Sequence, residues 1–480
     1  MKKMIELIKK KALRDTALTI LVIVILITCF IGINLLVQSF NLSPIDVTKE
    51  KLYSLSDKSK EKVKQIEQEI QIYLFGYTEE SSLYNLINQY TAVNSKITVE
   101  AVTATSRPDL ATLYGVDSDD QTGVVIQGTS QYKVLSENDF YTPDTTTGET
   151  IDLTEQKLTN SMIDIVTEDK PQIYFLTGHD EYSISTYLYS IGVYLQNEVN
   201  DVYELDLLTK SIPEDCDVIV IATPQKDFSE YETELLIEYI NNGGDLLWLN
   251  DPDLAETEYP NIQKILDLYG VSFGRGIIIE QDSANMLLDN PEFIKPTVAY
   301  HTITKDIYNG SGIMFIDAGR IEIADTDMLE ELNVTSVPFI RSGENSFFRK
   351  DLSISTVSKT DDDEEGSQVL GAELTKTVSD GKESKLVVYA NNLFATSSKL
   401  NTGNYTVTAV ELYNNKDLVL NTVAYLAGKE DAITIRKDTG DVTYTATAQE
   451  DTVIRVIIFA IPVVILVVGI VIWQVRRRKK

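Results

Sequence analysis

The sequence predicts an α/β protein in which two α/β domains lie between two transmembrane helices. Three observations support this prediction. Two uncharged apolar segments lie near the ends of the 480-residue chain, and the region between them is strongly acidic. Within that region, short apolar runs alternate with amphipathic segments of helical periodicity, which is typical of α/β folds.

Residues 17–37 and 456–475 are the two apolar segments, and neither contains a charged residue. Each is long enough to cross a hydrocarbon core of about 30 Å, which requires roughly 20 residues of helix. The first is longer than the apolar part of a cleaved signal peptide, and residues 39–42 (SFNL) are a poor cleavage site. We therefore expect two retained transmembrane helices.

Basic residues flank both apolar segments. Residues 1–16 contain five lysines and one arginine, and residues 476–480 read RRRKK. Lys and Arg next to a transmembrane helix favour the cytoplasmic side of the membrane. We expect a protein of the cell membrane with two cytoplasmic tails (1–16 and 476–480) and an extracytoplasmic region between the two helices.

The extracytoplasmic region carries more negative charge than the −31 of the whole chain, because both ends are basic. This charge repels nucleic acid and anionic lipid, so we expect no nucleic-acid partner; the simplest interpretation is solubility. The two cysteines, Cys29 and Cys216, are divided between the first apolar segment and the acidic region. They predict neither a disulfide nor a cysteine metal site.

Residues 38–70 are predicted to form a juxtamembrane segment and a helix that Ser56 caps and that ends near Gln68. Residues 71–169 follow as the first domain. Its predicted elements are strand 71–75, helix 82–92, strand 97–102, short helix 109–114, hairpin 123–127 and 131–135, and helix 154–166. This order is that of a thioredoxin-like fold. Residues 76–79 (GYTE) stand where redox members have C-x-x-C, which excludes disulfide chemistry.

Residues 170–430 are predicted to form the second domain. Strands at 173–176, 202–207, 217–222 and 245–250 alternate with a helix at about 185–196 and a helix that starts at the capping box Ser229 to Glu232. This alternation predicts a parallel doubly wound sheet of the flavodoxin-like or class I glutamine-amidotransferase-like kind. The pattern of residues 270–341 does not indicate a clear order of helices and strands. We expect a solvated acidic loop at 361–365, a strand at 385–390 and a helix ending before Gly428.

Residues 431–455 then return the chain to the membrane, and an extended stretch is expected at 442–446.

The best candidate site is the loop Gly178, His179, Asp180 and Glu181, which follows the first strand of the second domain. Open α/β sheets bind ligands beyond the carboxyl ends of their strands. Asp251 follows another strand of this sheet, so the five residues form a candidate ligand-binding set. A histidine beside two acids can act as a base or a metal ligand. The alternative is that these side chains only cap the next helix.

Several kinds of chemistry are absent from the sequence. No G-x-x-x-x-G-K-[ST] motif is present to bind ATP phosphates. Residues 250–253 (NDPD) offer no Ser or Cys at the turn where amidotransferase-like enzymes have a nucleophile. Cys216 precedes a strand, and His301 would need long-range convergence to share a metal with His179. We expect no catalytic residue, no metal site and no cofactor.

The ordered motifs of the chain resemble the GldG-like auxiliary component of ABC transporters, a family named for its gliding-motility member. The resembling segments are 45–56 (IDVTKEKLYSLS), 173–181 (IYFLTGHDE), 212–217, 223–229, 243–252 and 473–478. The resemblance implies an extracytoplasmic module that works with a separate ABC ATPase and a separate multi-span permease, without catalytic residues of its own. Thr302 departs from similar proteins, which often have proline after the histidine.

Three functions remain open. The leading hypothesis is a non-catalytic auxiliary subunit of an ABC transport system. The second is an extracytoplasmic α/β hydrolase or amidase-like enzyme that uses His179 with Asp180 and Glu181. The third is a surface receptor or adhesion protein that binds through the acidic face.

Overall fold

The computed structural model describes Thr28 and residues 55–143, 150–252, 258–309, 312–354, 357–401 and 406–429. The predicted transmembrane helices at 17–37 (Thr28 apart) and 456–475 lie outside these residues, as do most of the juxtamembrane segment and the extended stretch at 442–446. Among the described residues, none of the helices combines the length and the apolar character that crossing a membrane requires.

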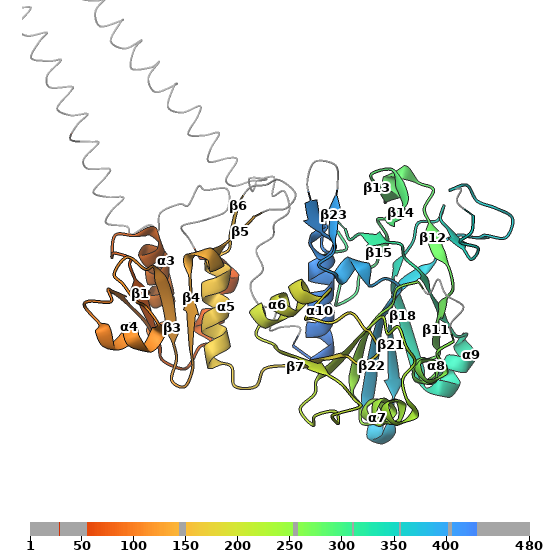
Figure 1. Ribbon diagram of the computed structural model, residues 1–480, viewed down its shortest axis with the longest axis horizontal. Helices are drawn as coiled ribbons and strands as arrows, with labels where there is room; N and C mark the ends of the chain where they lie inside the picture. The colour runs from red at the N-terminus through yellow and green to blue at the C-terminus, as the bar shows by residue number, and fades with distance from the viewer. Residues whose placement is uncertain are drawn as a thin grey trace, which may run out of the picture. The chain divides into compact units, whose positions relative to one another are not determined.

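A four-stranded sheet of order β2-β1-β3-β4 organises residues 55–166 (Figure 1). Strands β1 and β2 are parallel, and the other neighbours are antiparallel. The strands are β1 (Ile70–Phe75), β2 (Ile97–Val102), β3 (Gly123–Gln127) and β4 (Tyr132–Leu135), with small β5 (Tyr141–Pro143) and β6 (Thr150–Asp152). The helices are α2 (Asp57–Lys64), α3 (Ser82–Val93), α4 (Pro108–Tyr114), η1 (Glu137–Phe140) and α5 (Thr154–Val166).

The predicted order of elements is present in this region. Ser56 caps α2 by accepting a hydrogen bond from the Ser59 amide, but the helix ends at Lys64, earlier than expected. Apolar residues of α2, α3 and α5, such as Val63, Ile87 and Leu158, pack on one face of the sheet. Helix α4 covers the other face through Leu110. The region therefore has two hydrophobic clusters, one on each side of its sheet.

The larger region contains an eight-stranded sheet of order β15-β18-β21-β22-β10-β9-β7-β8. Five of its strands are parallel: β7 (Gln172–Leu176), β8 (Asp201–Leu205), β9 (Val218–Ala222), β10 (Asp245–Leu249) and β22 (Glu383–Tyr389). The chain passes from β7 to β8 on one side and then to β9 on the other. The junction of β7 and β9 is therefore the topological switch point, where such sheets form a crevice.

Three antiparallel strands extend this sheet, which corrects the prediction of a wholly parallel one. They are β15 (Thr297–Val298), β18 (Val334–Arg341) and β21 (Val369–Thr377). Strand β21 joins β22 through the short η3 (Ser379–Gly381). Such a tight connection permits only antiparallel pairing, because parallel neighbours need a long crossover.

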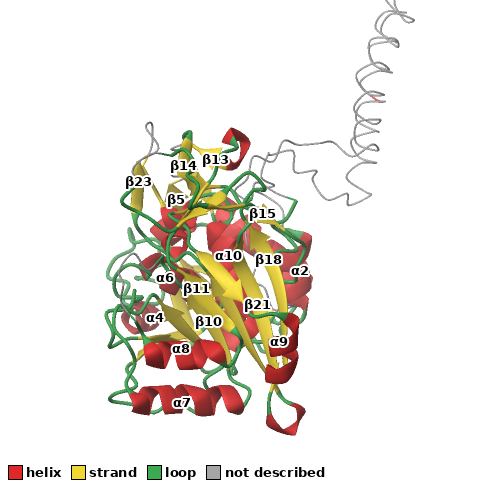
Figure 2. Cartoon of the chain, turned by 90° about the vertical axis from the view of Figure 1, so that its right-hand side faces the viewer, coloured by secondary structure: helices red, strands yellow, loops and turns green. Residues whose placement is uncertain are grey.

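Alternate residues of the parallel strands face opposite hydrophobic clusters. Val220, Leu247 and Val387 pack with α6 (Tyr189–Asn197) and α10 (Asn415–Leu426). Ile219 and Leu246 pack with α7 (Glu230–Asn241) and α8 (Pro260–Asp267), which lie together on one side of the sheet in Figure 2. Burial on both faces explains why these strands are apolar throughout.

Helix α6 begins at Tyr189, whereas the sequence predicts a start near Ser185. The amide and the hydroxyl of Ser185 both donate to Glu204 Oε1 on β8. These bonds hold residue 185 outside the helix, because its backbone donor is satisfied by a strand side chain. Residues 184–188 form turns instead.

The remaining strands form small sheets around the large one: β11 (Val271–Gly274) with β17 (Arg320–Ile323), β12 (Ile277–Ile279) with β19 (Phe347–Arg349) and β20 (Glu364–Glu365), β13 (Met286–Leu287) with β14 (Asn290–Ile294) and β16 (Phe315–Ile316), and β23 (Lys399–Asn401) with β24 (Thr406–Thr408). The short helices are η2 (Ser283–Asn285), α9 (Thr326–Leu332), η4 (Leu393–Ala395) and η5 (Ala409–Glu411).

The acidic segment 361–365 is not simply solvated, contrary to expectation. Asp363 is buried and accepts a hydrogen bond from Arg349 Nη2 at 2.8 Å. The Arg349 guanidinium lowers the pKa of the Asp363 carboxyl. Asp363 therefore fastens this segment to β19.

Candidate functional site

The loop after β7 lies at the switch point of the large sheet and is bonded across it. The Tyr182 amide donates to Ala222 O at the end of β9 (3.0 Å), and the Gln225 amide donates to His179 O (2.8 Å). Gly178 and Asp180 have positive φ values of 121° and 58°, which bend the loop back on itself. The loops after β7 and β9 are thus tied together where a doubly wound sheet usually opens to a ligand.

His179 lies between two carboxylates inside this loop. Its Nδ1 is 3.2 Å from Glu181 Oε1, and its Nε2 is 3.2 Å from Glu232 Oε2. All three residues are buried, and the Phe228 ring packs against the imidazole at 4.9 Å between ring centroids. The His179 side chain is therefore enclosed by carboxylates and an aromatic ring of the same chain.

Glu232 has a second role at the start of α7. Its Oε2 accepts hydrogen bonds from the Ser229 amide (2.8 Å) and the Ser229 hydroxyl (2.7 Å), which completes the predicted capping box. A helix N-terminus attracts anions through its free amides and its dipole. Here the protein supplies that anion itself. Glu181 is equally engaged, since its Oε2 accepts a 2.6 Å hydrogen bond from the His179 amide.

Asp180 points away from this cluster. It forms a 2.7 Å ion pair with Lys226, and both side chains are largely exposed. Exposed pairs of this kind contribute about 0–1 kcal/mol to stability. The structure thus brings His179 and Glu181 of the candidate set together, while Asp180 faces solvent and Gly178 contributes only backbone geometry.

Asp251 belongs to a different set of contacts. Its Oδ1 accepts a hydrogen bond from the Asn392 amide at 3.0 Å, and the Tyr182 hydroxyl lies beside its carboxylate. The Asp251 amide donates to Thr223 Oγ1 at 3.1 Å. Burial raises the pKa of Asp251, although the hydrogen bond from the Asn392 amide acts in the opposite direction.

Glu232, Tyr182 and Asn392 are the residues that sequence reasoning missed in this area. Glu232 was assigned to a helix cap, but nothing in its local pattern indicates the contact with His179. Tyr182 directly follows the candidate loop, so its position in the sequence indicates that it lies near the site. Asn392 is 141 residues from Asp251 along the chain. Only the parallel alignment of β10 and β22 brings it there.

His301 forms a separate cluster beside α10. Its Nε2 is 2.7 Å from Glu373 Oε2, and its Nδ1 accepts a hydrogen bond from the Ile303 amide at 3.2 Å. The Tyr425 hydroxyl donates to Glu373 Oε1 at 2.8 Å. Within the residues that the structure describes, no group of three or more His, Cys, Asp or Glu side chains is arranged to hold a metal ion.

Cys216 is partly buried, with its Sγ 3.7 Å from the Tyr239 hydroxyl. Burial raises the pKa of the thiol to about 12. The reactive thiolate is therefore scarce at neutral pH.

Comparison with known proteins yields one family and several distant folds. A search of curated proteins gives no match. Among solved structures, the N-terminal domain of mmIFT52 is 14% identical, with coverage of 53% of this chain and 97% of that one and a TM-score of 0.38. ThuA-like proteins from Bacteroides uniformis and Parabacteroides merdae are each 11% identical with TM-scores of 0.30. They cover 54% and 56% of this chain, and 93% and 92% of their own lengths.

The family match covers the region whose fold and polar clusters are described above. The sequence pattern of the ABC-type uncharacterized transport system auxiliary family matches residues 170–422, which are more than half of the 480-residue chain. The matched region starts just before β7 and ends within α10, so it contains the whole eight-stranded sheet. The chain therefore belongs to the auxiliary family of the ABC-type uncharacterized transport system.

Proposed function

We propose that this chain is a non-catalytic, extracytoplasmic auxiliary subunit of an ABC transport system and that it acts with a separate ATPase and a separate permease. Membership of the auxiliary family supports the role in transport. The sequence has no P-loop, so the energy of ATP hydrolysis has to come from another chain. The two predicted transmembrane helices would place the subunit beside a permease in the cell membrane.

The observation that carries the non-catalytic part of this proposal is the internal bonding of His179. A general base has to reach the proton that it removes. Both ring nitrogens of His179 instead face buried carboxylates of the same chain. The loops after β7 and β9 are also bonded to each other across the switch point. These contacts support a role in holding the fold over a role in turnover.

The strand orders of the two sheets support the more specific fold interpretations of the two domains. The parallel strands follow the order β8-β7-β9-β10-β22, which is the 2-1-3-4-5 order of flavodoxin-like sheets. This order supports the flavodoxin-like or amidotransferase-like interpretation. The order β2-β1-β3-β4 with one parallel pair supports a thioredoxin-like first domain. The ordered motifs support a GldG-like member of the family.

Co-purification tests the proposal directly. The full-length tagged protein is extracted from its native membranes in a gentle detergent, and its partners are identified by mass spectrometry. We expect an ABC ATPase and a multi-span permease to co-purify in constant ratio. An unrelated tagged protein with two transmembrane helices serves as the matched control. Repeated recovery of the chain without those partners, from membranes that contain them, would overturn the proposal.

A hydrolase assay distinguishes the proposed non-catalytic role from the main alternative, a hydrolase or amidase-like enzyme. The purified protein is incubated with ester and amide substrates, next to a His179→Gln variant whose folding is verified by circular dichroism. We expect no turnover by either protein. Turnover by the native protein that the variant lacks would favour the hydrolase or amidase-like alternative.

A further inference from the structure

The eight-stranded sheet ends at β8, which pairs with another strand on one side only. It lies last in the strand order and is parallel to its neighbour β7. The Asp201 amide donates to Pro171 O at 2.9 Å, so residue 201 directs its backbone groups toward β7. Successive residues of a strand direct these groups to opposite edges. The N–H and C=O groups of Val202 and Glu204 therefore point outward, where no described strand pairs with them.

The two edges of this sheet differ in how well they are protected against pairing. The opposite edge is β15, which has only two residues and so offers little backbone to another chain. Strand β8 has five residues (DVYEL), and it has neither the lysine, the proline nor the bulge that commonly protects an edge. A further extended segment can therefore add to the sheet at β8 through backbone hydrogen bonds.

One face of the sheet is also uncovered at this edge. Helix α6 packs on the side of Val202, whereas residues 206–217, which join β8 to β9, form turns and no helix on the other side. On that uncovered side the Tyr203 ring stacks on Tyr174 of β7, with 5.2 Å between the ring centroids. The Tyr203 side chain is 45% exposed. An accessible aromatic surface thus adjoins the unpaired backbone of β8.

The charge around this edge is strongly negative. Residues 201–217 contain six acidic residues and one basic residue, Lys210. Asp201 and Asp217 lie together at the start of the β7–β8 pair, because both accept hydrogen bonds from Gln172, at 3.0 and 2.8 Å. Among the ion pairs between described residues, none includes an acidic residue of this segment. These carboxylates therefore attract a cationic partner.

The backbone, the aromatic surface and the charge together define the kind of partner. A second copy of β8 would bring like charges together across the new strand pair, which is unfavourable. An extended peptide with a basic residue at every second position avoids this repulsion. Its backbone would pair with Val202 and Glu204, and its basic side chains would all lie on one face, over the Tyr203 ring and beside Asp201 and Asp217.

We propose that the outer edge of β8, with Tyr203 and the carboxylates of Asp201 and Asp217, is a docking site for an extended basic peptide segment of another protein. The segment adds to the large sheet as a further strand. The site is formed by residues 201–217 together with β7, and it uses none of the side chains around His179. Its test requires no transport partner, so its outcome is independent of the proposed transport role.

Fluorescence anisotropy with the full-length protein in detergent tests this proposal. The probe is a labelled peptide of about eight alternating Lys and Thr residues, which is long enough to form a strand. The buffer contains about 0.15 M salt, which screens general attraction to the acidic surface. We expect saturable binding of this peptide. A peptide of alternating Glu and Thr should not bind, and a Lys-Thr peptide with every backbone amide N-methylated should bind at least about tenfold more weakly, because it cannot donate to the β8 edge.

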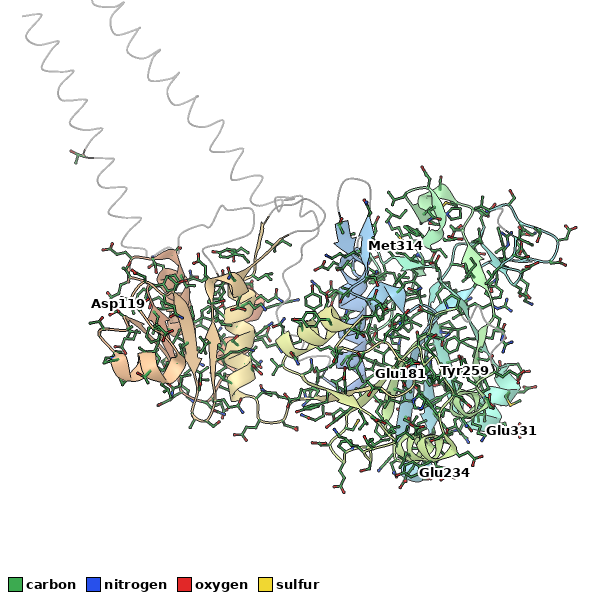
Figure 3. All side chains as sticks on the ribbon, viewed as in Figure 1. Asp119, Glu181, Glu234, Tyr259, Met314 and Glu331 are labelled. Atoms are coloured by element: carbon green, nitrogen blue, oxygen red, sulfur yellow. The ribbon has the colours of Figure 1, made fainter. Side chains whose placement is uncertain are left out.

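Variants with matched controls locate the site. Tyr203→Ser should weaken binding of the Lys-Thr peptide by about tenfold, as for a central aromatic contact. Tyr300→Ser is its control, since Tyr300 is 68% exposed and follows β15 at the opposite edge. Asp201→Asn keeps an acceptor oxygen for Gln172 and should weaken binding by about threefold, as for a partly exposed charge pair. Its control is Glu331→Gln on α9 (Figure 3), which removes an exposed carboxylate far along the sheet order from β8.

Folding of each variant is verified by circular dichroism, and sedimentation velocity shows whether the protein associates with itself. The proposal is overturned if the Lys-Thr peptide does not bind, if its N-methylated form binds equally well, or if the control variants weaken binding as much as Tyr203→Ser and Asp201→Asn do. It is also overturned if the protein forms a dimer that Tyr203→Ser disrupts, because a second copy of the chain would then occupy the edge.

Discussion

The two histidines of the chain lie in different hydrogen-bonding environments. His179 faces a carboxylate with each ring nitrogen. His301 faces the carboxylate of Glu373 with Nε2, but its Nδ1 accepts a hydrogen bond from the Ile303 amide. The first ring therefore connects two carboxylates, while the second connects one carboxylate to a backbone amide. The partner atoms, and not the residue type, decide what each ring holds together.

The two environments also differ in what they connect. His179 joins the loop after β7 to the N-terminus of α7 at the carboxyl edge of the sheet. His301 joins the loop after β15 to β21, and Tyr425 of α10 shares the same carboxylate. Burial raises the pKa of Glu373, but hydrogen bonds from His301, Tyr425 and Thr375 outweigh burial and leave this pKa below its ordinary value. Glu373 thus has donors on three other side chains, whereas the carboxylates beside His179 share its imidazole and also accept from backbone amides, Glu181 from residue 179 and Glu232 from Ser229.

The largest expected effect is that of His179→Ala. The substitution removes the imidazole from beside two buried carboxylates at once, and a buried polar group that loses its partner costs about 1–3 kcal/mol, or more when it is charged. Urea unfolding at pH 7 would measure the loss. Asp180→Asn in the same loop is the control, and we expect it to change stability by less than about 0.5 kcal/mol. If His179→Ala is as mild as the control, the double ion pair has no stabilising role.

A second prediction concerns Asp245, which lies near the His301 cluster. Its Oδ1 accepts a hydrogen bond from the Lys385 amide at 2.7 Å. Burial raises the pKa of Asp245 from 3.8 to about 7, and the charges of Glu373 and Glu383 also raise it. The folded state therefore holds the proton more tightly than the unfolded state does. This group's contribution to stability is full below the unfolded pKa and is lost as pH rises through the folded one.

Asp245→Asn keeps the acceptor oxygen and removes the charge. Above pH 7 we expect the variant to be more stable than the native protein by about 2 kcal/mol, with the difference vanishing below pH 4. Urea unfolding of both proteins between pH 4 and pH 8 would reveal this crossover. Parallel stability curves for the two proteins would show that Asp245 does not titrate in that range.

Most of the correct predictions from the sequence depend on local patterns of residues. Ser229 and Glu232 stand three residues apart, and this spacing alone indicated the cap of α7 that the structure confirms. The loop at 178–181 follows an apolar run, so its place at a strand end was predictable. Each of these features depends on neighbours within a few residues, and the amino-acid pattern records such neighbours directly.

Long-range contacts account for what was missed. The set of five candidate residues divides in the structure, because Asp251 accepts a hydrogen bond from Asn392 while His179 faces Glu181 and Glu232. Asp363 was expected in solvent, but Arg349 holds it in the interior. Strand β18 contains Pro338 and register shifts, so its period is broken and the antiparallel half of the sheet could not be read from the sequence. Each case depends on which strands become neighbours.

His301→Ala should have a smaller effect than the loss of His179. Glu373 keeps its hydrogen bonds from Tyr425 and Thr375 when the imidazole is removed, so its charge remains partly satisfied. We expect a loss of about 1–2 kcal/mol in urea unfolding, the range for one hydrogen bond to a charged group. His301→Gln offers a donor to Glu373 and is expected to recover part of this loss. A loss equal to that of His179→Ala would remove the contrast between the two clusters.

The smallest effect expected is that of Ser229→Ala, and it tests whether the His179 cluster and the cap of α7 act as one unit. The substitution removes an N-cap hydroxyl, which costs about 1 kcal/mol. It also removes one of the donors to Glu232 Oε2, the oxygen that faces His179. The unfolding free energies of Ser229→Ala, of His179→Ala and of the variant that combines them would form a double-mutant cycle. Because both substitutions act on one carboxylate, the double variant should depart from the sum of the single effects by at least about 0.5 kcal/mol. Strict additivity would mean that Glu232 serves the helix cap and the histidine independently, and His179 would then stabilise the loop without any link to α7.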